Sequence, residues 1–149
     1  AEKNLMYALG YAPDGGIYSE IYFKWSESIR KLGDVHKSDS LNSLGLYFAR
    51  TRVAGSPSVL IYWLLLGEAY IYSDIADSAL THLQIVEKNE NRKYYIGRNF
   101  LAMGKAYDLM GKRDEAKKYY KNVLDNRSAV YHKREAEKLL KTQYKLYDY

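Results

Sequence analysis

The chain has 149 residues, 47% of them hydrophobic, which suffices for one domain with a continuous core and excludes a disordered chain. It contains no cysteine, so disulfides, thiolate catalysis and cysteine-based zinc sites are excluded. The net charge of +5 arises wholly within residues 112–149, a mild excess compared with the dense basic clusters usual in nucleic-acid binding.

Neither a membrane span nor a compartment can be assigned from the sequence. The longest apolar run, Val59 to Gly67, is far shorter than the ~18 residues that cross a bilayer. No signal-peptide pattern is present, and the first residue is Ala1, which is compatible with a mature end, a cut fragment or a tag remnant. A chain without cysteine folds in reducing or oxidising surroundings alike, so the localisation is left open.

Residues 1–17 are expected to form an N-terminal segment with a short helix over residues 1–10. A turn follows at Ala12-Pro13-Asp14-Gly15-Gly16, a composition that breaks helices. Residues 18–52 then predict a pair of helices. The first helix carries one face made of Tyr22, Trp25, Ser26 and Ile29.

The first pair is expected to turn at Gly33-Asp34. Its second helix would place a small residue at Ser40, followed by Leu44 and Tyr47. This alignment requires a turn about two residues longer than in the units that follow, and the 41-residue spacing from Tyr22 to Trp63 indicates a longer connection as well.

Residues 57–91 predict a second helix pair. Ser56 is a good N-cap and Pro57 fits the first helical position, so we expect the first helix to begin there. A turn through Ser73-Asp74 would then cap a second helix over residues 75–89.

The same spacing recurs in residues 94–127, with every position offset by 37 residues, a turn at Gly111 and a second helix over residues 113–126. An internal period of this size indicates a repeat architecture. Glycine in a helix interior costs roughly 1 kcal/mol relative to alanine, so we expect Gly67 and Gly104 to permit close packing against the second helices. The packing positions are Trp63, Gly67, Tyr70 and Ala79 in one unit, and Phe100, Gly104, Tyr107, Ala116 and Tyr120 in the next.

A final helix is predicted over residues 129–147, with Ser128 as its N-cap. Its outer face is rich in lysine and arginine, as a helix that closes the exposed core of a stack should be. Its apolar face would consist of Ala136, Leu139, Leu140, Gln143 and Tyr147.

The 37-residue pattern, including the pairs Ala69-Tyr70 and Ala106-Tyr107, resembles the tetratricopeptide repeat over residues 60–127. The resemblance implies an all-α fold, a right-handed helical-hairpin solenoid of about three such units with a C-terminal capping helix, in a single domain over residues 1–149. Residues 18–52 resemble a worn copy. The family often ends a unit with proline, but this chain has Asn91 and Ser128 there, so capping is expected to set the linkers.

In this family the first helices of the units line a concave groove that binds a peptide or helix of a partner protein. The groove positions implied by the resemblance are Phe23, Glu27, Ile61, Leu64, Glu68, Arg98, Leu101, Lys105 and Asp108. Some members hold a C-terminal carboxylate with Asn and Lys, but the Asn positions here are Glu27, Glu68 and Lys105, so that clamp is not expected. Aliphatic residues mixed with both charge signs suit an amphipathic or extended peptide.

No catalytic, metal or cofactor site is predicted. The three histidines, His36, His82 and His132, lack the spacing of a metal site. Glu27 and Glu68 could approach each other, but acid–base catalysis would need a positioned substrate as well.

The 17 tyrosines are unusual, and several have no packing role in the repeat pattern. They are either interface residues or half-buried residues at helix ends and repeat junctions. These tyrosines are Tyr72, Tyr94, Tyr95, Tyr119, Tyr144 and Tyr149.

The sequence therefore predicts a non-enzymatic adaptor or scaffold whose partner is another protein or a peptide. A self-association module, with a homo-oligomer as its partner state, and a regulatory domain of a larger protein are the alternatives. RNA binding is unfavoured because the groove positions are nearly neutral, and the basic C-terminal region would permit peripheral contact with a membrane at most.

Overall fold

The computed structural model describes residues 18–126 and 130–147, and within these ranges it contains seven α-helices and no strand. The expected N-terminal segment of residues 1–17 and the expected cap at Ser128 lie outside the described residues. The helices are α2 (Tyr18–Lys31), α3 (Val35–Gly55), α4 (Leu60–Tyr72), α5 (Ala76–Asn89), α6 (Lys93–Leu109), α7 (Arg113–Asp125) and α8 (Val130–Lys141).

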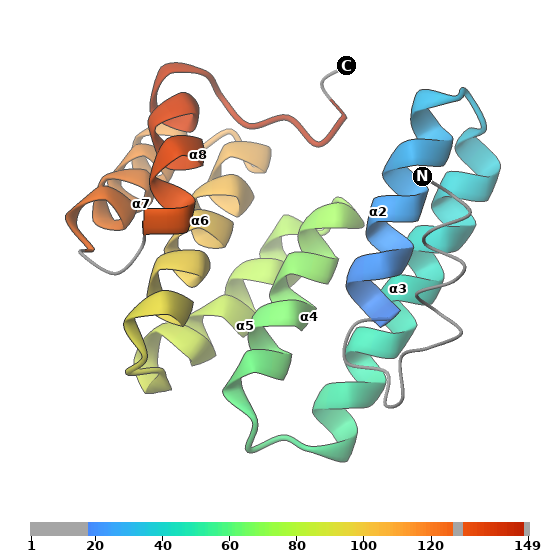
Figure 1. Cartoon of the computed structure of the whole chain (residues 1–149), viewed down its shortest axis with the longest axis horizontal. Helices are drawn as coiled ribbons and strands as arrows, with labels where there is room; N and C mark the ends of the chain where they lie inside the picture. The colour runs from blue at the N-terminus through green and yellow to red at the C-terminus, as the bar shows by residue number, and fades with distance from the viewer. Residues whose placement is uncertain (1–17, 127–129, 148–149) are drawn as a thin grey trace.

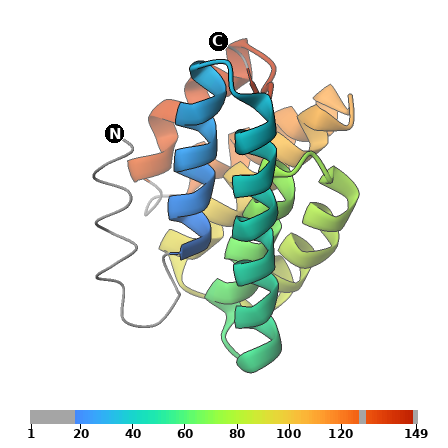
Figure 2. The same ribbon diagram turned by 90° about the vertical axis from the view of Figure 1, so that its right-hand side faces the viewer.

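Consecutive helices pack as antiparallel hairpins, α2 with α3, α4 with α5 and α6 with α7, and the hairpins stack side by side (Figure 1). Helix α8 packs against α7 and α6 at one end of the stack, and α2 and α3 form the other end, as Figure 2 shows. The expected all-α solenoid of three helical hairpins with a C-terminal capping helix is thus confirmed. Among the first helices of the hairpins, α2 packs against α4, and α4 packs against α6.

Glycine allows the close approach of the two helices in the second and third hairpins. A Cβ atom built on Gly67 would lie 2.5 Å from a methyl carbon of Leu83, and one on Gly104 would lie 2.3 Å from the ring of Tyr120. The nearest side chains belong to Leu83 and Tyr120, one helical turn beyond the facing alanines that the pattern suggested. Those alanines, Ala79 and Ala116, are fully buried.

An aromatic sandwich also recurs with the repeat. In the second hairpin the ring of His82 stacks on Trp63 at 5.6 Å and on Tyr70 at 5.0 Å. In the third hairpin Tyr119, the equivalent residue, packs against Phe100 at 5.9 Å and Tyr107 at 5.4 Å. His82 and Tyr119 are thus packing residues of the second helices.

The predicted alignment of the first hairpin was wrong. Ser26 on α2 pairs with Ser38 on α3, and their hydroxyl oxygens lie 2.8 Å apart. The number of residues between these two serines equals the number between Gly67 and Ala79, so Ser38 and not Ser40 holds the small-residue position. Ser40, Leu44 and Tyr47, which were expected to pack inward, are exposed. No longer turn is needed, because the extra length lies in α3, which has 21 residues against 14 in α5.

The predicted start of the second hairpin was also wrong. Ser56 ends α3 by donating its N–H to the carbonyl of Arg52, and α4 begins at Leu60. Pro57 lies in the turn between the two helices, where its carbonyl accepts a hydrogen bond from the indole of Trp63 at 2.8 Å. This proline therefore fixes the connection between hairpins instead of starting a helix.

All three hairpins turn through a residue with positive φ: Gly33 at 90°, Asp74 at 58° and Gly111 at 72°. Asp74 with Ser73 therefore ends α4 instead of capping α5, whose N-cap residue is Ile75. The left-handed residue allows the next N–H to reach back and satisfy an end carbonyl of the preceding helix. These bonds join Asp34 to Ile29 at 3.3 Å, Ile75 to Tyr70 at 2.9 Å and Lys112 to Tyr107 at 2.9 Å.

Glu90 organises the linker between α5 and α6, where many repeats of this kind have proline. Its carboxylate accepts hydrogen bonds from the backbone N–H groups of Asn91 at 3.0 Å and Arg92 at 2.9 Å, and from the Arg92 guanidinium at 2.8 and 2.6 Å. The guanidinium hydrogen bond in particular lowers the pKa of Glu90 from 4.5 to about 2.

Replacing Gly104 by leucine should destabilise the fold, because the new side chain would occupy the space of the buried Tyr120 ring. We expect a loss of roughly 1–3 kcal/mol or more in the free energy of unfolding, measured by urea denaturation. Gly55→Leu is the matched control, because a Cβ atom at Gly55 meets no atom within 4 Å. Equal stability of the two variants would contradict the packing described.

Glu90→Gln should make the stability of the chain less dependent on acid pH. Because the pKa of Glu90 is lowered in the fold, its carboxylate stabilises the fold above pH 4.5, and this contribution disappears as the pH falls to about 2. The melting temperature of the variant should therefore be lower than that of the parent chain at pH 7, and the difference should vanish near pH 2. The exposed Glu137→Gln serves as the control, and a difference that persists unchanged at low pH would refute the linkage.

Candidate functional site

A hollow of about 230 Å³ opens between the first helices α2, α4 and α6. Its walls combine an apolar floor with charged side chains of both signs. The apolar residues are Phe23, Leu65, Ile71, Leu101 and Ala102, and the charged residues are Glu20, Lys24, Glu68, Arg98 and Lys105.

Arg98 joins the three hairpins at the wall of this hollow. Its guanidinium donates two hydrogen bonds to the carboxylate of Glu68, at 2.7 and 2.6 Å, and a further one to Glu20. The three residues come from α6, α4 and α2, so one cation links a helix of each unit. Burial acts to lower the pKa of Arg98, but the two carboxylates outweigh it and raise the pKa, so the side chain stays charged.

A second ion pair lies at the junction with the capping helix. The ammonium of Lys105 on α6 is 2.6 Å from a carboxylate oxygen of Glu135 on α8. The same ammonium lies 5.3 Å from the ring centroid of Tyr144. Lys105 therefore contacts both α8 and the residues that follow it.

Residues 142–147, here called the C-terminal strap, leave α8 and run along the stack toward the first hairpin (Figure 1). The side-chain amide of Gln143 donates to the backbone carbonyl of Asp108 at 2.9 Å, and the backbone N–H of Tyr144 donates to the carboxylate of Asp108 at 2.8 Å. At the far end the Tyr147 hydroxyl lies 3.3 Å from the Tyr72 carbonyl. The strap thereby contacts the ends of α6 and α4 in turn.

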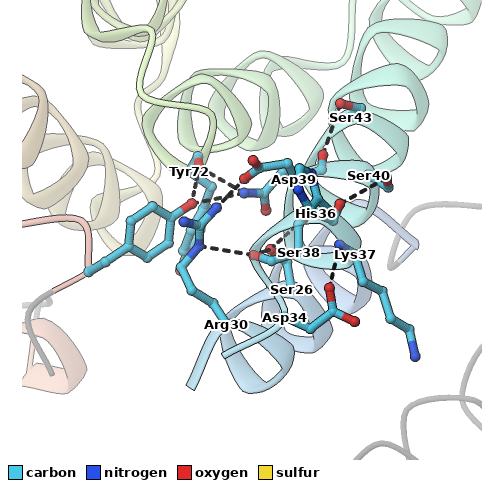
Figure 3. Close-up of polar contacts among 12 residues, drawn as sticks. Ser26, Arg30, Asp34, His36, Lys37, Ser38, Asp39, Ser40, Ser43 and Tyr72 are labelled. Carbon is cyan, nitrogen blue, oxygen red and sulfur yellow. Dashed lines mark hydrogen bonds and ion pairs between the residues drawn. The ribbon is translucent and has the colours of Figure 1, made fainter. Parts of the chain in front are cut away.

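The far end of the strap also reaches the first hairpin. The Asn42 side chain of α3 donates to the Tyr147 hydroxyl at 2.9 Å, and the Arg30 guanidinium of α2 lies 4.0 Å from the centroid of the Tyr147 ring. Figure 3 shows the Arg30 side chain beside Ser38 and Asp39 of α3, close to the end of α4 at Tyr72. Arg30 also donates to Ser38 at 3.0 Å and pairs with Asp39.

The prediction of helix over residues 129–147 is wrong beyond Lys141, where α8 ends. Residues of α6 and α7 cause the helix to end there. In a continued helix the N–H of Tyr144 would donate to the carbonyl of Leu140. Instead, the guanidinium of Arg113 donates to that carbonyl at 3.1 Å and to the Leu139 carbonyl at 2.6 Å, while Asp108 accepts from Tyr144. Tertiary hydrogen bonds have replaced helical ones.

Asp108 is buried, and its carboxylate is fully satisfied by charged and polar donors. It accepts from Arg113 at 3.0 and 2.8 Å, from the Tyr120 hydroxyl at 2.8 Å and from the Tyr144 N–H at 2.8 Å. Burial and the hydrogen bond to Asp108 raise the pKa of Tyr120. The carboxylate thus holds α7 and the C-terminal strap against α6, and does not face a ligand.

A second hollow, of about 260 Å³, adjoins the first and shares Tyr144 with it. Tyr147 and Leu146 of the strap form part of its wall, together with Glu27 and Lys31 of α2. Both hollows share four lining residues, Phe23, Tyr72, Lys105 and Tyr144. Burial, followed by nearby acidic groups, raises the pKa of Tyr72, so its phenol is neutral at ordinary pH.

Most of the residues expected in a groove do gather here. Five of them, Phe23, Glu68, Arg98, Leu101 and Lys105, line the first hollow. Glu27 lines the second hollow instead.

The remaining three expected groove residues lie elsewhere. Leu64 is fully buried in the core, and Leu65, one residue further along α4, lines the hollow in its place. Ile61 is half-buried against the core, and Asp108 is buried in the polar cluster described above. Tyr144, which the repeat pattern left without a packing role, lines both hollows.

The carboxylates at equivalent repeat positions do not form an acid–base pair. Glu68 is bound by Arg98, and Glu27 lies 2.8 Å from the ammonium of Lys31. Within residues 18–126 and 130–147, no group of three or more His, Asp or Glu side chains could hold a metal ion. No helix in the same ranges is long and apolar enough to cross a membrane.

Comparison with known families adds one finding. Residues 98–128 match the tetratricopeptide repeat. This stretch begins within α6 and includes all of α7, which together form the third hairpin. The matched stretch thus lies in one of the three stacked hairpins, and this finding supports the resemblance to tetratricopeptide repeats. Neither a curated protein nor a solved structure gave a match.

Tetratricopeptide repeats are modules for protein–protein interaction and are generally not enzymes. Stacked repeats of this kind create an extended concave surface, because each unit is slightly rotated relative to its neighbour. The hollow between α2, α4 and α6 lies on the helices that form such a surface.

Arg98→Met should weaken the link between the three hairpins. The change removes two hydrogen bonds to Glu68 and one to Glu20, and leaves both half-buried carboxylates without their cation. Hydrogen bonds to charged groups contribute roughly 1.5–3 kcal/mol, so we expect a loss of that order in the free energy of unfolding in urea.

Lys118→Met, at an exposed position of α7, is the control for the Arg98 variant and should change the unfolding free energy by less than ~0.5 kcal/mol. If both variants are equally stable, the Arg98 cluster does not hold the stack together.

Proposed function

We propose that this chain is a protein-interaction module that binds a non-helical peptide segment of a partner protein in the hollow between α2, α4 and α6. The observation that carries the proposal is the composition of that hollow. An apolar floor from three different helices is surrounded by charged side chains, of which Glu20, Glu68, Arg98 and Lys105 form ion pairs.

The size of the hollow favours a peptide side chain over a helix. An α-helix with its side chains is about 10–12 Å across, which is too wide for a space of this volume. About 230 Å³ instead accommodates one or two large side chains, with the rest of the peptide crossing the rim. The faces of Phe23 and Leu101 that line the hollow would pack against an aromatic or aliphatic group of the peptide.

The electrostatics favour a neutral anchoring side chain. The positive charge of Arg98 is matched by Glu68 and Glu20, and that of Lys105 by Glu135. A charged group that bound Arg98, Glu68 or Lys105 would have to break one of these pairs, and an unpaired charge at a partly buried site is costly. Specificity therefore comes from apolar contact and from backbone hydrogen bonds.

Self-association is the second candidate, and a different observation favours it. The two ends of the stack expose large side chains, Tyr47 on α3 at 62% and Tyr131 on α8 at 82%. Exposed tyrosine is common at interfaces because it contributes a large contact area. Light scattering over a range of concentrations separates this candidate from the first.

The peptide-binding proposal is tested by selecting peptides from a displayed random library with the whole chain. Selected peptides should carry an aromatic or large aliphatic anchor. Leu65→Gln should weaken their binding by about tenfold or more, because burying a leucine-sized side chain contributes roughly 1.5–3 kcal/mol. Fluorescence anisotropy with a labelled selected peptide measures the change.

The matched control is Ile85→Gln, which alters a half-buried aliphatic residue on the second helix α5, outside the hollow. It should bind selected peptides as tightly as the parent chain does. Failure to select any peptide, or equal weakening by both variants, would count against binding in the hollow.

A further inference from the structure

We propose that the C-terminal strap, residues 142–147, is an internal ligand of the concave surface and that a partner peptide binds by displacing it. The partner chemistry that follows is a non-helical segment with aromatic residues three positions apart, like Tyr144 and Tyr147. This inference rests on the proposed peptide-binding function and adds to it a competitor and a ligand pattern.

The strap lies where a bound peptide would lie. Its contacts follow the C-terminal ends of the three first helices in order, from Asp108 on α6 to Tyr72 on α4 and Arg30 on α2. A segment from outside the repeats thereby spans all three units. The final carbonyl groups of a helix have no partner within that helix, so such ends are suited to accept hydrogen bonds from a crossing chain.

Two tyrosines supply the anchoring contacts of the strap. The ring of Tyr144 lies between the two hollows, beneath the ammonium of Lys105. The ring of Tyr147 lies beneath the guanidinium of Arg30, and its hydroxyl reaches Asn42 and Tyr72. Cation–π contact and a hydrogen bond at the tip are interactions that any tyrosine of a partner peptide could reproduce.

The two ends of the strap are held differently. At Tyr144 the backbone N–H is bound to the buried carboxylate of Asp108. No side chain from Thr142 to Tyr147, including that of Tyr147 at the other end, is fully buried. Segments with few buried apolar contacts open locally at a free energy well below that of global unfolding. The Tyr147 end can therefore detach while Asp108 keeps α8 in place.

The strap competes with a partner peptide because it is covalently attached to the chain that it binds. A segment attached next to its own site has an effective concentration in the millimolar range for a short linker. A partner peptide must outcompete it, so its apparent affinity is reduced by the fraction of chains in which the strap is bound. Weakening the strap should then tighten the binding of a peptide added in solution.

The test uses the whole chain and a defined probe, the fluorescein-labelled, C-terminally amidated peptide of residues 142–147, Thr-Gln-Tyr-Lys-Leu-Tyr. The chain carrying Tyr147→Ala should bind this peptide at least tenfold more tightly than the parent chain in an anisotropy titration. Tyr131→Ala, an exposed tyrosine of α8 outside both hollows, is the matched control and should bind it as the parent does.

A second probe establishes that the tyrosines carry the binding. The same peptide with Tyr144→Ser and Tyr147→Ser should bind neither chain. Equal affinity of the parent and Tyr147→Ala chains for the unmodified peptide overturns the proposal, and so does absence of binding to the variant when its melting temperature shows that it is folded.

Failure of this inference is distinguishable from failure of the proposed function. If library-selected peptides bind the parent and Tyr147→Ala chains equally well in the hollow, peptide binding stands and displacement of the strap is refuted. If the strap peptide binds Tyr147→Ala but the library yields no peptide, the strap is a ligand of its own chain and the partner role is refuted.

Discussion

The buried carboxylate of Asp108 is the interaction on which the C-terminal half of the structure depends. A buried charge is tolerated only when hydrogen bonds replace its hydration, and here Arg113, Tyr120 and Tyr144 supply them. The Tyr120 ring that reaches this carboxylate also fills the space left by Gly104. The packing of the third hairpin, the end of α8 and the course of the C-terminal strap are therefore set together.

The two hollows at the first helices are also lined by paired charges. Equivalent repeat positions carry Glu27, Glu68 and Lys105, and each forms an ion pair, with Lys31, Arg98 and Glu135 respectively. The charges at these three positions therefore already have partners of opposite sign. In the proposed binding mode, a peptide would be recognised by the apolar floor and by the helix-end carbonyl groups, and the strap contacts carbonyl groups of this kind at Asp108 and Tyr72.

The repeat pattern predicted the close packing of the second and third hairpins at Gly67 and Gly104 because this packing follows a local rule. A glycine on the first helix packs against a large side chain of the second helix. The same arrangement recurs 37 residues later. In the first hairpin the roles are reversed, because the ring of Phe23 on α2 would lie 2.9 Å from a Cβ atom of Gly45 on α3. The predicted alignment placed the small residue at Ser40, two positions beyond Ser38 on the same helix, and so every later position on α3 was shifted as well. The choice of Leu64 over Leu65 reflects a single helical step, which spacing alone does not resolve.

The C-terminal strap was beyond prediction from local sequence for a physical reason. The spacing of Ala136, Leu139, Leu140, Gln143 and Tyr147 is that of an amphipathic helix, and nothing within this stretch stops it. The stop comes from Arg113 and Asp108, which take the hydrogen bonds that the next helical turn would have made. Helix propensity is a weak preference that tertiary contacts override. Because the contacts that end α8 also place Tyr144 in the walls of both hollows, the capping helix and the C-terminal strap are one continuous segment whose path is set by Asp108.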